Sequence, residues 1–318
     1  MTQLSVKVVS KVVEAIDIVS LELASTDGKT LPSFSAGAHI DVHLPGGITR
    51  QYSLLNDAAE QHRYVIGVLK DPESRGGSIA IHDKVNVGDV LQISTPRNHF
   101  ELVPAQRSLL LAGGIGVTPI LCMARRLAQT SADFEMHYCT RSPERTAFQQ
   151  EIQAASFAGR VHFHYDNGDE AQKLNLKALV AGPSDSTHLY VCGPTGFIDF
   201  VVNTAKEAGW SSNHIHYEYF GAAEIDTSGD QSFKVKIAST GAMLDVDADK
   251  SITQVLEENG VFVPVSCEEG VCGTCLTRVL EGVPEHRDMY LTEDEQAAND
   301  QMLPCCSRAK TPVLVLDL

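Results

Sequence analysis

The sequence is poor in basic residues. Lys and Arg together number 25 against 41 Asp and Glu, which leaves a formal net charge of −16. Nucleic acids and anionic membrane surfaces attract basic patches, so this deficit argues against both as partners. It favours a positively charged protein partner instead.

Long hydrophobic runs are also missing. The longest stretch without a charged residue, 108–124, has 17 residues, and three glycines and Pro119 interrupt it. That is too short and too broken for a membrane span, so we interpret it as a buried strand, a turn and the start of a helix. The first 23 residues alternate like a strand and lack the features of a signal peptide. We therefore expect a cytoplasmic protein.

No disulfide framework is expected, although the chain has eight cysteines. Such frameworks belong to small secreted chains, whereas cysteines spread over 318 residues without an export signal are typical of thiols and metal ligands. Four of them follow the pattern Cys-x4-Cys-x2-Cys…Cys, with 29 residues before the last. They are Cys267, Cys272, Cys275 and Cys305. This spacing is typical of iron–sulfur clusters.

A zinc knuckle is the alternative interpretation of these cysteines. Structural zinc sites usually pair one Cys-x2-Cys with a second close pair, but here a four-residue gap comes first and a lone cysteine follows. Gly270 and Gly273 permit a loop that curls around a cluster and leaves amides free to donate to sulfur. The spacing therefore predicts a [2Fe-2S] cluster and an electron carrier. Cys122, Cys139 and Cys306 are interpreted as buried thiols.

Three regions of different character follow one another along the chain. Residues 1–103 contain short β-rich segments separated by turn residues, which predicts a small antiparallel barrel or sandwich. In 104–221 apolar strands alternate with helical stretches, as in a doubly wound α/β domain. Residues 222–231 are small, polar and acidic and predict a linker. A third unit, 232–318, carries the cysteine pattern.

The third unit is strongly acidic, with 15 acidic and 7 basic residues in 232–318, a net charge of −8. This charge is either an ordinary solvated surface or a means of steering the unit onto a basic electron acceptor.

A glycine-rich turn lies in the second region. An apolar strand runs into Gly113 and Gly114, and Thr118 and Pro119 mark the first turn of the helix that follows. Free amides and the helix dipole favour a phosphate at such an N-terminus. The spacing is not the Gly-x-Gly-x-x-Gly fingerprint, so a plain tight turn remains the alternative.

A second turn, Cys192-Gly193-Pro194, also ends an apolar strand ahead of a helix. Ligands in open α/β sheets bind beyond the carboxyl ends of the strands, so the two turns could flank one ligand.

In the first region, Arg50 and Tyr52 lie on one face of a predicted strand and Ser53 on the other. A guanidinium beside an aromatic hydroxyl suits a flat anionic ligand, although Arg and Tyr also alternate on ordinary exposed strands. Gly77 and Ser78 then open a short helix and offer an anion-binding turn.

The histidines show no metal-binding pattern. His162 with His164, and His214 with His216, alternate along predicted strands, and we interpret them as surface or core residues.

Together these motifs resemble the phthalate dioxygenase reductase family over the whole chain, in runs such as AGGIGVTPILCMA, YVCGP and CGTCLTRVLEG. The resemblance implies a flavin-binding antiparallel β-barrel, an NAD-binding doubly wound α/β domain and a C-terminal β-grasp ferredoxin domain of plant type, in that order. One departure is visible, because Cys305-Cys306 stands where the family usually has a single cysteine. Alignment and the 29-residue gap favour Cys305 as the fourth ligand.

The resemblance also implies roles for individual residues. Arg50, Tyr52 and Ser53 would lie against the flavin, and Gly77 and Ser78 at its phosphate. Phe220 would lie beside the flavin ring, its alternative being a packed aromatic at a domain edge. The nicotinamide dinucleotide would be lined by Gly113, Gly114, Thr118, Cys192, Gly193 and Pro194.

The activity implied by the resemblance is electron transfer from NADH through FMN, rather than FAD, and the cluster to a Rieske-type oxygenase. An aromatic O-demethylase is the expected partner, and an oxygenase acting on carnitine or phthalate is the alternative. A stand-alone flavin reductase and a redox-sensing binding protein are the rival functions. No side chain is expected to act as an acid or base. NADPH remains an alternative to NADH, because Arg141 and Arg145 could bind its 2′-phosphate.

Overall fold

The computed structural model describes residues 3–44, 47–72, 76–221, 227 and 229–318. The chain divides into two compact units, Met1–Glu218 and Tyr219–Leu318. Most of the predicted linker 222–231 lies outside the described residues. No helix in the described part of the chain has the length and apolar character needed to cross a membrane.

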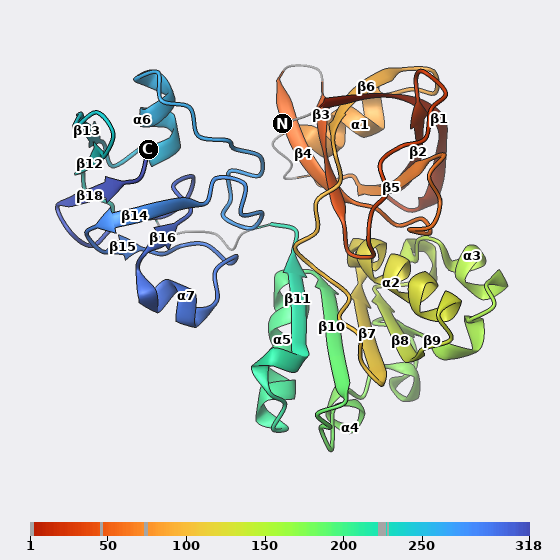
Figure 1. The fold of residues 1–318 in the computed structure, drawn as a ribbon. Helices are drawn as coiled ribbons and strands as arrows, with labels where there is room; N and C mark the ends of the chain where they lie inside the picture. Colours follow the sequence, from red (N-terminus) through yellow and green to blue (C-terminus); the bar gives the residue numbers. More distant parts are fainter. Residues whose placement is uncertain (1–2, 45–46, 73–75, 222–226, 228) are drawn as a thin grey trace. The chain divides into compact units, whose positions relative to one another are not determined.

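An antiparallel six-stranded sheet opens the first unit, in the order β4-β3-β6-β1-β2-β5 (Figure 1). A bridge between Leu54, directly after β4, and Ile66 in β5 joins the two edges, so the sheet closes into the predicted barrel. The helix α1 (Gly77–Lys84) packs against it. The strands are β1 (Gln3–Ala15), β2 (Ile18–Ser25), β3 (His39–Leu44), β4 (Ile48–Ser53), β5 (Tyr64–Leu69) and β6 (Val90–Ser94).

The second part of this unit is a five-stranded sheet in the order β11-β10-β7-β8-β9, in which β7, β8, β9 and β10 run parallel (Figure 1). Helices alternate with the strands, as the sequence pattern predicts. The strands are β7 (Arg107–Gly113), β8 (Asp133–Thr140), β9 (Val161–Tyr165), β10 (Thr187–Gly193) and β11 (Ile215–Tyr219). The helices are α2 (Val117–Gln129), α3 (Gln149–Ala154), α4 (Leu176–Leu179) and α5 (Thr195–Glu207).

The barrel and the parallel sheet share a hydrophobic core. Ile18 and Leu55 of the barrel belong to the same buried cluster as Leu121 of α2 and Tyr138 of β8. Burying apolar surface between the two halves stabilises them as one body.

The second unit is a mixed five-stranded sheet in the order β13-β12-β18-β14-β16, with β12 and β18 parallel. Helix α6 (Ile252–Glu258) begins with a capping box between Ser251 and Gln254 and buries one face in the core of the unit. The other elements are β12 (Phe233–Ile237), β13 (Met243–Val246), β14 (Thr277–Glu281), β15 (Pro284–Glu285), α7 (Glu293–Ala298), β16 (Gln301–Met302), β17 (Arg308–Ala309) and β18 (Val313–Leu316). The predicted succession of barrel, doubly wound sheet and β-grasp fold is confirmed.

Candidate functional site

The four cysteines of the pattern gather in the second unit, and all of them are buried. The thiol of Cys267 lies within hydrogen-bonding reach of those of Cys272 and Cys305. The thiol of Cys275 in turn reaches that of Cys305. Four buried thiols connected by these contacts are the donor set that an iron–sulfur cluster requires.

The loop around these cysteines has the curl that the glycines predict. Glu268, Gly270 and Gly273 all have positive φ, at 58°, 76° and 68°. Two amides point at sulfur: Glu269 N lies 3.4 Å from Cys267 Sγ, and Thr274 N lies 3.5 Å from Cys272 Sγ. Amide donors of this kind orient thiolates and tune a cluster's potential, so the residues present fit a [2Fe-2S] centre.

Cys306 occupies a different position from its neighbour. It is half-buried, and its sulfur lies 3.7 Å from the Leu303 carbonyl oxygen and 3.8 Å from Ser307 Oγ. Only Cys305 of this pair meets the thiols of Cys267 and Cys275. The geometry therefore favours Cys305 as the fourth ligand.

The predicted flavin residues of the barrel lie together. The Arg50 side chain crosses Gly77 so closely that a Cβ there would come within 2.5 Å of Arg50 Cγ. The helix behind Gly77 begins after Gly76, whose φ is 90°, and has no acidic residue in its first turn. Ser78 Oγ accepts a hydrogen bond of 3.1 Å from the Asp71 amide. A guanidinium at a helix N-terminus fits a phosphate.

Tyr52 is the aromatic member of this group. Burial raises the pKa of its hydroxyl above the ordinary value, so the ring stays neutral and can lie against a flat ligand.

The two glycine-rich turns lie against each other. A Cβ on Gly116 would come within 2.3 Å of the Cys192 carbonyl carbon and oxygen, and one on Gly193 within 2.9 Å of Gly113 Cα. Gly114, with φ of 53°, has open space where a side chain would stand. Only glycine allows this close approach, so the two turns pack directly against each other, and their role in binding one ligand stays a prediction.

Thr118 and Pro194 lie next to these turns. Thr118 is buried, its hydroxyl donates to the Ile115 carbonyl at 3.1 Å, and its methyl group lies against Gly67 of β5. Pro194 is the residue at the N-terminal cap of α5.

One further residue, Glu218 at the end of β11, joins the two groups. Ser53 Oγ donates to its carboxyl oxygen Oε2 at 3.5 Å. Burial raises the pKa of the Cys192 thiol, and the charge of Glu218 raises it further. Burial raises the pKa of Glu218 itself to about 8. Sequence reasoning missed this residue, although it lies two positions before Phe220.

Phe220 follows β11 and is 42% exposed. Its role beside a flavin stays a prediction.

Comparison with known proteins agrees with this organisation. The family model described as a 2Fe-2S iron–sulfur cluster binding domain matches residues 235–310. The model for the N-terminal domain of the dimethylamine monooxygenase subunit DmmA-like family matches residues 95–215. The first match confirms the predicted iron–sulfur domain.

Relatives match over almost the whole chain. A vanillate O-demethylase oxidoreductase from a Pseudomonas species is 57% identical over 305 residues, covering 96% of each chain. Phthalate dioxygenase reductase of Burkholderia cepacia is 41% identical, covering 99% of this chain and 97% of the other. A solved structure of phthalate dioxygenase reductase, described as modular for electron transfer from pyridine nucleotides to [2Fe-2S], has a TM-score of 0.77 at 40% identity, covering 99% and 98% of the two chains.

The fold and the cysteine site define an iron–sulfur oxidoreductase. More specifically, the chain belongs to the phthalate dioxygenase reductase family.

Proposed function

We propose that this reductase takes a hydride from NADH onto a bound FMN and passes the electrons singly through its [2Fe-2S] cluster to a Rieske-type oxygenase. A flavin is needed because a hydride carries two electrons and the cluster accepts one. The observation that carries the proposal is the shared carboxyl of Glu218, which lies between Ser53 of the barrel and Cys192 of the glycine turns.

Each of these side chains has a distinct part. The Cys192 thiol stays protonated, because burial raises its pKa, and it packs in the hydrophobic core at the end of β10. Glu218, with a pKa of about 8, holds a proton at neutral pH next to Ser53 Oγ. A neutral carboxyl and a hydroxyl keep this junction polar without placing a charge in it.

We propose FMN over FAD, with Arg50, which lies against Gly77 at the start of α1, holding its one terminal phosphate. Acid extraction of the purified protein followed by mass spectrometry would identify the flavin directly. FAD in the extract would refute this part of the proposal.

NADH is proposed over NADPH. Of the two arginines that follow β8, Arg145 already pairs with Asp17 at 3.1 Å. A 2′-phosphate would have to compete with that carboxylate. The ratio of kcat/KM for NADH and NADPH tests the preference, and we expect NADH to be favoured at least about tenfold, or about 1.4 kcal/mol.

The oxygenase partner is proposed to be an aromatic O-demethylase, after the names of the relatives with 51–57% identity. Other relatives are named as reductases of a phthalate dioxygenase and of tetrachlorobenzoquinone. Purified reductase mixed with an O-demethylase oxygenase, its aromatic methyl ether and NADH should release the demethylated product. Full turnover on quinone or oxygen without an oxygenase would favour the stand-alone reductase.

We also propose three modules bounded at 103/104, 221/222 and 231/232, and action in the cytoplasm. Eight free cysteines suit a reducing compartment, where thiols and thiolate-bound clusters persist.

A further inference from the structure

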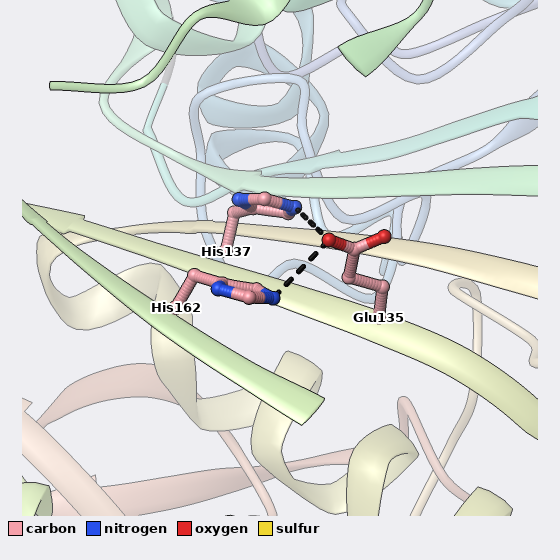
Figure 2. Close-up of side chains that lie close together, drawn as sticks. All are labelled: Glu135, His137 and His162. Carbon is pink, nitrogen blue, oxygen red and sulfur yellow. Dashed lines mark ion pairs between the residues drawn. The ribbon is translucent and has the colours of Figure 1, made fainter. Parts of the chain in front are cut away.

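Three side chains that the electron path does not use meet at one edge of the parallel sheet. Glu135 and His137 project from β8 and His162 from β9 (Figure 2). Residues two apart on a strand share a face, and the parallel register places His137 directly beside His162. Nε2 of each histidine lies 3.2 Å from the same carboxylate oxygen, Oε1 of Glu135.

The hydrogen bonds behind His137 fix its tautomer. The Gln172 carbonyl oxygen, 2.7 Å from Nδ1 of His164, can only accept, so that Nδ1 carries a proton. Neutral His164 then accepts at Nε2, which lies 2.9 Å from Nδ1 of His137. His137 therefore donates from Nδ1, and its Nε2 is left with a lone pair.

That lone pair faces the lone pairs of a carboxylate. His137 is 7% exposed, and within the described residues its buried Nε2 forms no hydrogen bond of acceptable geometry, although Glu135 Oε1 lies 3.2 Å away. Two acceptors 3.2 Å apart repel each other unless a cation lies between them.

A metal ion satisfies the same geometry. Zinc bonds to imidazole nitrogen and carboxylate oxygen are about 2.0–2.1 Å long, which separates neighbouring ligand atoms of a tetrahedron by about 3.3 Å. Each histidine Nε2 lies 3.2 Å from Glu135 Oε1, and all three ligand atoms lie within 4.8 Å of one another. We propose that Glu135, His137 and His162 bind one divalent transition-metal ion, with zinc as the matching metal.

The surroundings of the three ligands support this assignment. His164 and the Gln172 carbonyl orient His137 from behind, which is the usual arrangement behind a metal-bound imidazole. Arg107 lies 2.7 Å from Oε2 of Glu135 and leaves Oε1 for the metal. Because His162 is half-exposed, water can reach the fourth coordination position of the metal. Bound metal would tie the edge strand β9 to β8.

Calorimetric titration with Zn²⁺ tests the proposal. The protein carries its flavin and iron cluster, and the visible spectrum is followed to verify that iron is retained. We expect one zinc ion per chain and X-ray absorption showing nitrogen and oxygen neighbours only. His162→Ala should weaken binding at least about 100-fold and His164→Ala about 10- to 100-fold. Since His162 is half-exposed, its replacement leaves the fold intact.

His214→Ala is the matched control, because its ring lies 4.7 Å from that of His188, at an angle of 49°, in a different group of histidines. It should leave zinc binding unchanged. Zinc binding that survives His162→Ala, sulfur neighbours in the absorption spectrum, or no uptake by the wild-type protein would each overturn the assignment.

Discussion

The hydroxyl of Ser53 and the carboxyl of Glu218 form a hydrogen bond of 3.5 Å between residues 165 positions apart in the sequence. Ser53 ends the barrel strand β4, and Glu218 lies in the edge strand of the parallel sheet. The bond therefore connects the predicted flavin residues to the strand that follows the second glycine turn. The protonation of Glu218 therefore affects both the predicted flavin residues and the second glycine turn.

The stability of the protein should depend on pH through Glu218. Its pKa is raised from 4.5 to about 8, so the folded chain keeps a proton that the unfolded chain has already released. This contribution is fully present below pH 4.5 and is lost as the pH rises through about 8. The melting temperature of the wild-type protein should therefore fall between about pH 6 and about pH 9 more than that of Glu218→Gln, whose side chain cannot ionise. Parallel melting curves for the two proteins would contradict the raised pKa.

The contact between the two glycine turns should tolerate no side chain. Gly116→Ala places a Cβ 2.3 Å from the backbone of Cys192, so we expect a loss of stability of about 1–3 kcal/mol and weaker NADH binding. Gly196→Ala is the control, because no atom lies within 4 Å of its added Cβ. Chemical denaturation and the KM for NADH would measure both effects. Equal stability of the two variants would show that the turns are not in contact.

Much of this arrangement could be predicted because it is local in sequence. The cysteine spacing places three ligand candidates in nine residues, and the β-rich composition of 39–44 predicts a strand with the same bounds as β3. The composition of the segment near 143–155 predicts one helix, but the structure breaks it. A 3-10 turn spans Pro143–Arg145, Thr146 is extended, and Phe148 has φ of 59° before α3 begins. The hydroxyls of Thr140 and Thr146 bond at 2.7 Å, which draws the chain back toward β8 and ends the first turn.

Residues whose partners are distant could not be predicted. Nothing in the sequence around Glu218 marks it, because Ser53 and Cys192 reach it only through the fold. Likewise, alternation correctly placed His162 and His164 on a strand, but only the parallel register brings Glu135 and His137 beside them.

Removing one cluster cysteine should separate the two halves of the electron path. Cys272→Ser should abolish reduction of a cytochrome acceptor and lower the iron content, because serine is a poor substitute for a thiolate ligand. Reduction of ferricyanide by NADH, which needs only the flavin, should remain. Cys306→Ser is the matched control and should keep iron and both activities. Cys306 is not one of the four proposed ligands: its sulfur contacts Leu303 and Ser307, and it reaches the Cys305 thiol from outside the group. Loss of both activities in Cys272→Ser would refute a modular path.

The acidic character of the iron–sulfur unit should make electron delivery sensitive to salt. The segment 232–318 carries 15 acidic and 7 basic residues, so its field would attract a basic surface on a partner. Salt shortens the range of that attraction from about 10 Å at 0.1 M to about 3 Å at 1 M. Turnover with the oxygenase at limiting concentration should fall several-fold as salt rises from about 0.05 to about 0.5 M. The rate of flavin reduction by saturating NADH in the same buffers is the control, because it does not depend on association with the oxygenase. If neither turnover with the oxygenase nor the rate of flavin reduction changed with salt, the acidic residues would be ordinary solvated surface.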